Sequence, residues 1–314
     1  MLKRNESLYN LIQESEFIHF FEFVRYISFL VENEPTRNVG RPREKMRDII
    51  VCLLIWHKFP MLSARRARGL LLLFKKIKLI NVDIPCFKTL CNYREEPLVQ
   101  NILGKLIEES FKPLKEIEHD FATDSTGIRT NLFSSWFSLR MKKRIRKRDH
   151  LTIHVTTGVK SNITTAVDVC IERGKDNMIM RSHVDKTAKH FRINEWSGDG
   201  TYWSKENCRK IIEEGGKPYF KPKKHWSGNS RGCMAWKKMN LEFQKNIDEF
   251  NKHYHKRSNV ESTFGSKKKL HGTKVYSKSA SARINEETLR WINHNQAVLN
   301  RAYYEWNIIP RFLE

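Results

Sequence analysis

At 314 residues the chain is long enough for one large core and a smaller appended domain. Its 58 lysines and arginines outnumber 35 acidic residues, which gives a net charge of +23. This excess favours a protein that binds a polyanion such as nucleic acid over a basic protein without such a partner. No stretch approaches the roughly 20 apolar residues that span a bilayer, and no signal peptide is evident, so we expect a cytoplasmic protein without membrane segments.

The first 112 residues are predicted to form a helical N-terminal region. Apolar residues recur at helical spacing in four segments, residues 8–30, 46–59, 63–75 and 85–93. Ser63 is placed as the N-cap of the third helix, and Pro85 can open the fourth. The region is therefore expected to contain helices only.

A DNA-binding role is predicted for this region from two patterns. The third and fourth helices carry basic residues, Arg66 among them, and a short link between them would make a helix-turn-helix. Ordinary helix packing without DNA explains that pattern almost as well, and both interpretations stay open. The sequence Gly40-Arg41-Pro42-Arg43 resembles the hook of minor-groove binders, with a solvated linker as the alternative.

Residues 113–314 are predicted as a second domain that mixes strands and helices. Strands are expected at residues 117–123, 151–159, 162–171, 191–197 and 218–221, with a hairpin turn at Lys160-Ser161. Helices are expected at residues 178–189, 204–214, 236–269 and 284–306, with a break near His253 in the third. This order favours an α/β fold with a central mixed sheet flanked by helices.

Two aspartates are placed where predicted strands end. Asp124 is expected to follow a strand and to open a Ser-Thr-Gly turn, and Asp199 stands between Gly198 and Gly200. Strand ends are where side chains from separate segments of an α/β fold converge. Ordinary turn chemistry also explains each aspartate taken alone.

A predicted helix carries the third acid, Glu261. At about 100° per residue, Tyr254, Arg257, Glu261 and Lys268 fall within an arc of roughly 60°. The four residues thus form one stripe along the helix surface. A surface ion pair between Arg257 and Glu261 would explain two of them, but not why all four lie on the same stripe.

These three motifs together resemble a known family. The Tyr-x2-Arg-x3-Glu-x6-Lys signature is matched in full, and the turns at Asp124 and Asp199 are similar to those of DDE transposases of bacterial and archaeal insertion sequences. The resemblance covers roughly residues 45–300. It implies an RNase H-like mixed sheet that carries the two aspartates, a later helix that carries Glu261, and a DNA-binding N-terminal region.

The resemblance also implies the chemistry of the three acids. Asp124, Asp199 and Glu261 would be the catalytic residues and the ligands of Mg²⁺, with Mn²⁺ as a substitute, because hard cations prefer oxygen ligands. Two ions about 4 Å apart can activate an attacking oxygen and stabilise a leaving one. Water would first free a 3′-hydroxyl at the element end, and that hydroxyl would then attack a phosphate of the target DNA.

Other residues are expected to contact DNA. The resemblance places Arg257 and Lys268 at phosphates and Tyr254 beside them. A basic run that includes Lys143 and Arg144 lies between the first strand and the hairpin, where a solvated face is the alternative to a DNA channel.

The interval before Glu261 departs from part of the family. Some relatives insert a large β domain there, with a tryptophan that stabilises a flipped base, whereas only 61 residues separate Asp199 from Glu261. Trp226 and Trp236 lie in the interval and are candidates for stacking on a base, against the commoner fate of burial. A hairpin DNA intermediate stays open.

The expected partners are the double-stranded terminal inverted repeats of an element and a target DNA, which would place the protein at the nucleoid. Bringing two ends together implies a homodimer on DNA. Two alternatives remain, a nuclease of the same fold that does not join strands and a non-catalytic DNA-binding regulator derived from such an enzyme. The presence of all three acids disfavours the regulator.

Overall fold

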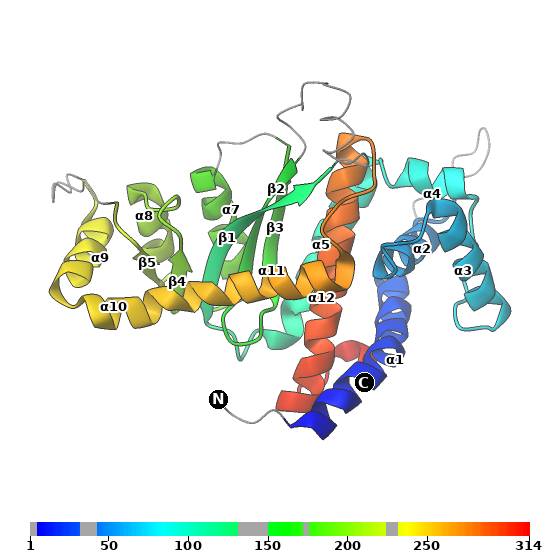
Figure 1. Cartoon of the computed structure of the whole chain (residues 1–314), viewed down its shortest axis with the longest axis horizontal. Coiled ribbons are helices and arrows are strands. Elements are labelled where there is room, and N and C mark those ends of the chain that lie inside the picture. Colours follow the sequence, from blue (N-terminus) through cyan, green and yellow to red (C-terminus); the bar gives the residue numbers. More distant parts are fainter. Residues whose placement is uncertain (1–4, 32–42, 131–149, 172–175, 224–231) are drawn as a thin grey trace, which may run out of the picture. The chain divides into compact units, whose positions relative to one another are not determined.

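The computed structural model describes residues 5–31, 43–130, 150–171, 176–223 and 232–314 of the chain (Figure 1). The chain divides into two compact units, of which unit 1 combines Met1–Pro113 with Leu270–Glu314 and unit 2 is Leu114–Lys269. The predicted second domain, residues 113–314, therefore loses its last 45 residues to the helical unit. No helix in the described part of the chain is long and apolar enough to cross a membrane.

The described residues of unit 1 contain several helices joined by loops, with a β-bridge residue at Lys274. The helices are α1 (Glu6–Leu30), α2 (Met46–Lys58), α3 (Ala64–Lys76), α4 (Phe87–Tyr93), α5 (Pro97–Phe111) and α12 (Ala280–Trp306), with a short 3-10 turn η3 (Arg311–Leu313). All residues of α2 except Arg47 are buried, because α1 and α12 both pack against it. The predicted cap is confirmed, since the Ser63 hydroxyl accepts a hydrogen bond from the Arg66 amide at 3.4 Å.

Helix α12 belongs to unit 1 because buried asparagines tie it to three other helices. Apolar spacing alone would allow it to pack against any apolar surface, whereas a buried amide must find specific partners. Three side chains on α12 donate to such partners: Asn293 to the Leu54 carbonyl in α2 at 3.2 Å, Asn295 to the Ser110 hydroxyl in α5 at 2.8 Å, and Asn300 to the Ile12 carbonyl in α1 at 2.7 Å.

The helix-turn-helix prediction is not matched in its connection. Helices α3 and α4 are joined by the ten residues 77–86, far more than the three or four of such a turn. The two helices contact each other, and the Arg65 guanidinium lies 4.2 Å from the centre of the Phe87 ring. The short connection was therefore wrong, although the helices themselves were predicted correctly.

Unit 2 is a mixed α/β arrangement around a five-stranded sheet. The strands are β1 (Asp120–Arg129), β2 (His150–Gly158), β3 (Thr164–Cys170), β4 (Glu195–Gly198) and β5 (Lys217–Phe220). Their order across the sheet is β3-β2-β1-β4-β5, with the first three antiparallel and β4 and β5 parallel to β1. The helices of this unit are α7 (Asp176–Ala188), α8 (Lys205–Glu213), α9 (Met234–Lys245), α10 (Ile247–Tyr254) and α11 (Ser258–His271), with the 3-10 turn η2 (His255–Arg257) between the last two.

Strand β1 presents its alternate residues to different helices. Thr123 shares a hydrogen bond of 2.6 Å with Thr156 of β2, which bonds in turn to His183 on α7 at 2.9 Å. Asp124, one residue further, points to the opposite face and accepts a hydrogen bond from Arg257 of η2 at 3.0 Å. Helix α7 thus covers one face of the sheet, and η2 lies over the other.

The predicted hairpin is confirmed, whereas two strand boundaries differ. Strand β1 continues to Arg129, so that Asp124 lies inside a strand and does not end one. Its residues 121–129 pair with β2, and this pairing outweighs the local preference of Asp-Ser-Thr-Gly for a turn. Strand β4 begins only at Glu195, so residues 191–194 form a connection where a strand was expected.

A buried carboxyl beneath the hairpin makes the stability of unit 2 depend on pH. Glu118 accepts the amide of Ser161 in the turn, and burial raises its pKa to about 7. The folded protein then holds a proton that the unfolded chain has lost, so stability is full below the ordinary pKa near 4.5 and falls as pH rises through 7. The loss amounts to at most about 3 kcal/mol.

We expect Glu118→Gln to abolish this dependence. Chemical denaturation should show that the free energy of unfolding of the wild type relative to the variant falls between pH 5 and 8, because the buried histidines whose pKa burial lowers contribute equally to both proteins. Glu116→Gln is the matched control, because the Glu116 side chain is 82% exposed. A difference between wild type and Glu118→Gln that stays constant with pH would show that Glu118 does not contribute to the pH dependence.

Candidate functional site

Asp124 and Asp199 lie next to each other on neighbouring parallel strands. Thr123 of β1 pairs with Gly198 of β4, so each aspartate is the residue that follows a paired position. Parallel neighbours are about 4.8 Å apart, and residues in register point to the same face. The structure therefore brings the two predicted aspartates together, although one lies within a strand and the other directly after one.

Hydrogen bonds from Thr201 and Tyr202 stabilise the turn at Asp199. Oδ1 of Asp199 accepts hydrogen bonds from the amide and the hydroxyl of Thr201, and its carbonyl accepts the Tyr202 amide at 3.1 Å. The Tyr202 side chain is buried, and its hydroxyl lies 3.0 Å from Nδ1 of His154 in β2. The turn interpretation of Asp199 is therefore confirmed, and the residue also stands beside Asp124.

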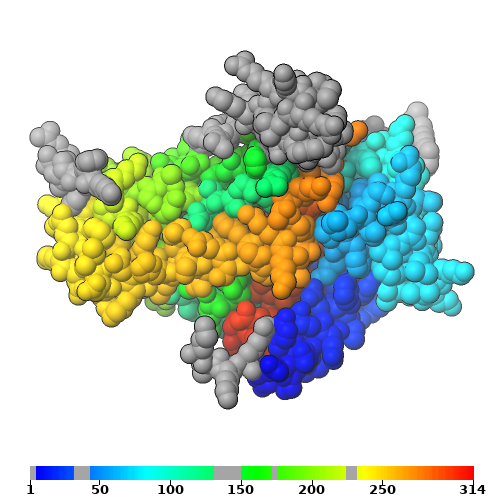
Figure 2. All heavy atoms as spheres, viewed as in Figure 1, coloured from blue at the N-terminus to red at the C-terminus, as the bar shows by residue number. Residues whose placement is uncertain are grey.

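The predicted stripe lies on helices that cross the sheet face of the two aspartates. Figure 1 shows α10, η2 and α11 following one line, and α10 and η2 contact β4. Figure 2 shows these helices at the surface of unit 2, which agrees with a Glu261 side chain that is 58% exposed. The predicted break is present, because the 3-10 turn at His255–Arg257 separates α10 from α11.

Members of the stripe make contacts with β1 and with one another. Lys268 donates to the Thr126 hydroxyl of β1 at 2.7 Å, two residues along the strand from Asp124. The Arg257 guanidinium lies 5.8 Å from the centre of the Tyr254 ring. The helical spacing of these residues thus predicted a real shared face.

Arg257 joins Glu261 to Asp124. Its Nη1 lies 3.0 Å from Oδ2 of Asp124, and its Nη2 lies 3.1 Å from Oε1 of Glu261. Burial raises the pKa of Asp124, whose side chain is only 14% exposed, and the guanidinium opposes that rise. The neighbouring charges of Asp199 and Glu261 raise it further, so one cation balances a concentration of negative charge.

The donor chemistry of the three acids fits a hard divalent cation. All their side-chain donors are carboxylate oxygens, the ligands that Mg²⁺ and Mn²⁺ prefer. Within the described ranges, however, no three His, Cys, Asp or Glu side chains are grouped closely enough to hold a metal ion. In this structure the Arg257 guanidinium stands between two of the three carboxylates, where a cation would bind.

The structure describes two of the five remaining predicted site residues. Lys143, Arg144 and Trp226 lie outside the described residues. Trp236 is buried on α9 and stacks on Trp203 with ring centres 4.9 Å apart, so it packs in the core and is not exposed for a base. Arg66 is exposed on α3 of unit 1.

A second layer of charged residues beneath the stripe was not predicted. Nζ of Lys256 lies 2.7 Å from Oδ2 of Asp120 and 2.7 Å from Oε2 of Glu195. The signal in the sequence was an acid four residues before each of Asp124 and Asp199. That these two acids lie side by side depends on the register of β1 with β4, and the sequence of a single strand does not determine this register.

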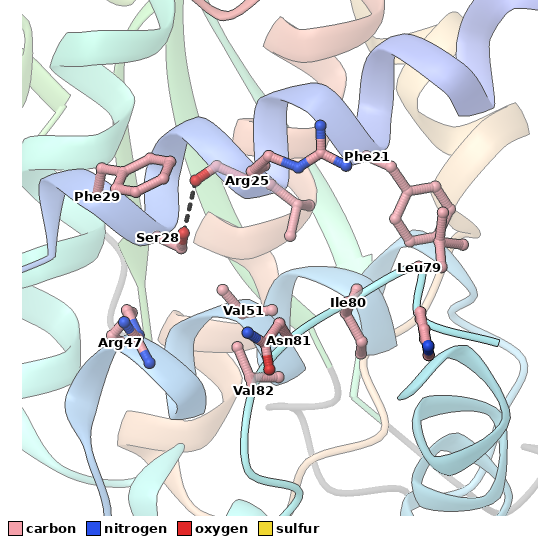
Figure 3. Close-up of a pocket in the computed structure, with 12 residues that line it drawn as sticks. Phe21, Arg25, Ser28, Phe29, Arg47, Val51, Leu79, Ile80, Asn81 and Val82 are labelled. Atoms are coloured by element: carbon pink, nitrogen blue, oxygen red, sulfur yellow. Dashed lines mark hydrogen bonds between the residues drawn. The ribbon is translucent and has the colours of Figure 1, made fainter. Parts of the chain in front are cut away.

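Unit 1 contains a separate pocket of about 300 Å³ (Figure 3). Residues of α1, α2 and the segment 78–82 line it, and Arg25, Arg47 and Lys78 supply positive charge. Arg25 already pairs with Glu22 at 2.8 Å, and Arg47 with Asp48 at 3.1 Å. None of the predicted site residues lines this pocket.

Comparison with known proteins adds no assignment to this geometry. No protein-family model matches the chain, and a search of curated proteins finds no match.

Proposed function

We propose that the chain is a metal-dependent DNA transposase that cuts at element ends and joins them to target DNA. The observation that carries the proposal is the cluster in unit 2, where Asp124 adjoins Asp199 and is linked through Arg257 to Glu261. Neighbouring carboxylates repel one another, and a bound divalent cation would relieve that repulsion more fully than the single charge of Arg257 does.

The order of elements in unit 2 supports an RNase H-like fold for this proposal. Such a sheet has an antiparallel meander of three strands followed by two parallel strands, with the acids on the first strand, after the fourth, and on a later helix. The sheet order β3-β2-β1-β4-β5 and the places of Asp124, Asp199 and Glu261 agree with that arrangement.

In the proposed reaction the chain's residues bind the metal ions and the DNA phosphates, orient the reacting groups and neutralise their negative charge. Mg²⁺ bound by the acids supplies activation of the attacking oxygen and stabilisation of the leaving oxygen. Hydrolysis at the element end gives a 3′-hydroxyl and a 5′-phosphate. In joining, that 3′-oxygen bonds to a target phosphorus, the target's own 3′-oxygen leaves, and the proton of the attacking hydroxyl passes to it. Arg257 and Lys268 would hold the phosphates through charge-assisted hydrogen bonds.

For a metal ion to bind Asp124 and Glu261, the ion pairs between these carboxylates and Arg257 would have to break. We expect Arg257→Met to bind Mn²⁺ about fivefold more tightly in the absence of DNA, because the displaced ion pairs are worth about 1 kcal/mol. The same variant should cleave DNA more slowly, since it has lost a phosphate contact. Electron paramagnetic resonance of free Mn²⁺ measures the affinity directly.

Lys268→Met is the matched control for this measurement. Lys268 lies on the same helical face and donates to the Thr126 hydroxyl, and among the described residues it pairs with no carboxylate. Its loss tests whether any missing positive charge tightens Mn²⁺ binding. Equal affinities in wild type and Arg257→Met would show that the guanidinium does not compete with the metal.

Joining distinguishes a transposase from a nuclease of the same fold. Because the element ends are unknown, the substrate is a pool of randomised duplexes with free 3′-hydroxyl ends, incubated with supercoiled plasmid and Mg²⁺. A transposase gives junctions between a duplex end and plasmid, and sequencing identifies the preferred ends. Nicked plasmid without junctions would favour the nuclease.

A further inference from the structure

Two acidic rows lie on the face of the sheet beneath η2. Asp120 of β1 is the register partner of Glu195 in β4. Four residues further along the chain, Asp124 and Asp199 directly follow Thr123 and Gly198, the last pair in the register of the two strands. The rows are about 13 Å apart at the rise of an extended strand. Only the second row belongs to the candidate metal site.

The residues between the two rows are small. Ala122 and Ser197 are register partners there, and both are buried. Small side chains allow the backbone of η2 to approach β1 and β4 closely, and η2 contacts both strands. The 3-10 turn therefore rests between the acidic rows and faces one on each side.

Consecutive cations of η2 engage the two rows. Lys256 bonds to both acids of the first row at 2.7 Å, and Arg257 reaches Asp124 in the second row at 3.0 Å. About three residues per turn separate neighbouring side chains by roughly 120°, so residues 256 and 257 diverge. The side chains of Lys256 and Arg257 therefore point away from each other, and each contacts a different acidic row.

His253 of α10 also contacts the first row. Nδ1 of His253 lies 2.8 Å from Oε1 of Glu195, and its ring stacks on Tyr219 of β5 with centres 4.7 Å apart. Burial alone would raise the pKa of Glu195, yet its bonds to Lys256 and His253 bring the pKa below its ordinary value. The carboxylate is therefore charged at neutral pH and lies against both Lys256 and His253.

We propose that Lys256 is a positioning residue that fixes η2 over β1 and β4 and thereby sets Arg257 and Tyr254 against Asp124. An isolated exposed ion pair would not restrict the backbone, because its net worth is close to zero. Lys256 differs from such a pair in that one ammonium joins two carboxylates on two strands, with only 31% of its side chain exposed. The catalytic consequence rests on the proposed function, whereas the positional claim does not.

The positional claim is tested without metal or DNA. The protein is labelled with 3-fluorotyrosine, and Tyr254 is assigned among its nine tyrosines by its absence from Tyr254→Phe. In Lys256→Met the Tyr254 fluorine resonance should shift and broaden as η2 loosens. Lys256→Arg retains the charge and the reach to both acids and should restore the wild-type signal.

Lys252→Met is the matched control, one helical turn earlier. Lys252 pairs with Glu249 at 2.7 Å, its single ion-pair partner in the part of the chain that the structure describes, and its side chain is 73% exposed. This variant should leave the Tyr254 resonance unchanged. If Lys256→Met unfolds the protein, Lys256→Gln takes its place, because its amide is uncharged and one bond shorter than the lysine side chain, so that it no longer joins both acids. An unchanged Tyr254 resonance in a folded Lys256→Met or Lys256→Gln variant would overturn the proposal.

Kinetics give the second readout. Lys256→Met should lower kcat for DNA cleavage about tenfold, the usual size of an effect exerted through a supporting residue, while the KM for DNA changes less than twofold. A rise in KM with unchanged kcat would make Lys256 a DNA contact and contradict the positioning role. If no form of the protein cuts DNA, the proposed function fails, and the fluorine signal still decides the role of Lys256.

Discussion

Asp124→Asn is expected to lower Mg²⁺-dependent DNA cleavage by more than about 100-fold while DNA binding is retained. Even residues that only support a metal ligand cost 10- to 100-fold on average, so loss of a charged ligand should cost at least the upper figure. Asparagine has nearly the same size as aspartate and still accepts the Ser125 amide that Oδ1 accepts at 2.8 Å. Folding should therefore be preserved.

The control for this loss is Asp185→Asn on α7. Asp185 is also a carboxylate of unit 2, but its side chain is 52% exposed and pairs with Lys210. Cleavage is measured at equal protein concentration on one DNA substrate, with binding followed separately by a mobility shift. Asp124→Asn cutting DNA as fast as Asp185→Asn would remove Asp124 from the catalytic set.

The largest effect on stability is expected in unit 1, at Arg290 on α12. Its guanidinium is buried between two buried carboxylates, with Nη2 2.5 Å from Glu286 and Nη1 3.5 Å from Glu287. It also donates to the Lys274 carbonyl at 2.8 Å, which ties the preceding loop to the helix. Arg290→Leu leaves both carboxylates in the core without their cation, and we expect a loss of about 3–5 kcal/mol.

A second arginine on the same helix supplies the comparison. Arg301 forms an i,i+4 pair with Glu305 at 2.7 Å, but 43% of its side chain is exposed. Arg301→Leu should cost no more than about 0.5 kcal/mol. Denaturant unfolding measures both variants, and similar losses for the two would mean that the buried charges near Arg290 are compensated in another way.

Helical periodicity predicted the stripe correctly because it depends only on local geometry. The angular positions of Arg257, Glu261 and Lys268 follow from residues per turn, and the short 3-10 segment did not separate them. Their contacts with Asp124 and Thr126 then follow from which side of the helix faces the sheet.

Features that depend on partners distant in sequence were not predictable in this way. Asp124 lies inside β1 because residues of β2 pair with it, which overrides its turn-forming neighbours. Helix α12 was predicted, but its place in unit 1 depends on carbonyls of α1 and α2 that its asparagines reach. Lys256 became meaningful only when the register put Asp120 beside Glu195.

The central claim is that Asp124, Asp199 and Glu261 together hold divalent metal ions. Anomalous diffraction from a crystal soaked in Mn²⁺ tests it most directly, since the metal is located without reference to activity. We predict an anomalous peak ligated by oxygens of all three acids, with the Arg257 guanidinium moved away from Asp124 and Glu261. A peak elsewhere in unit 2, or none at these carboxylates while Arg257 keeps both contacts, would contradict the account.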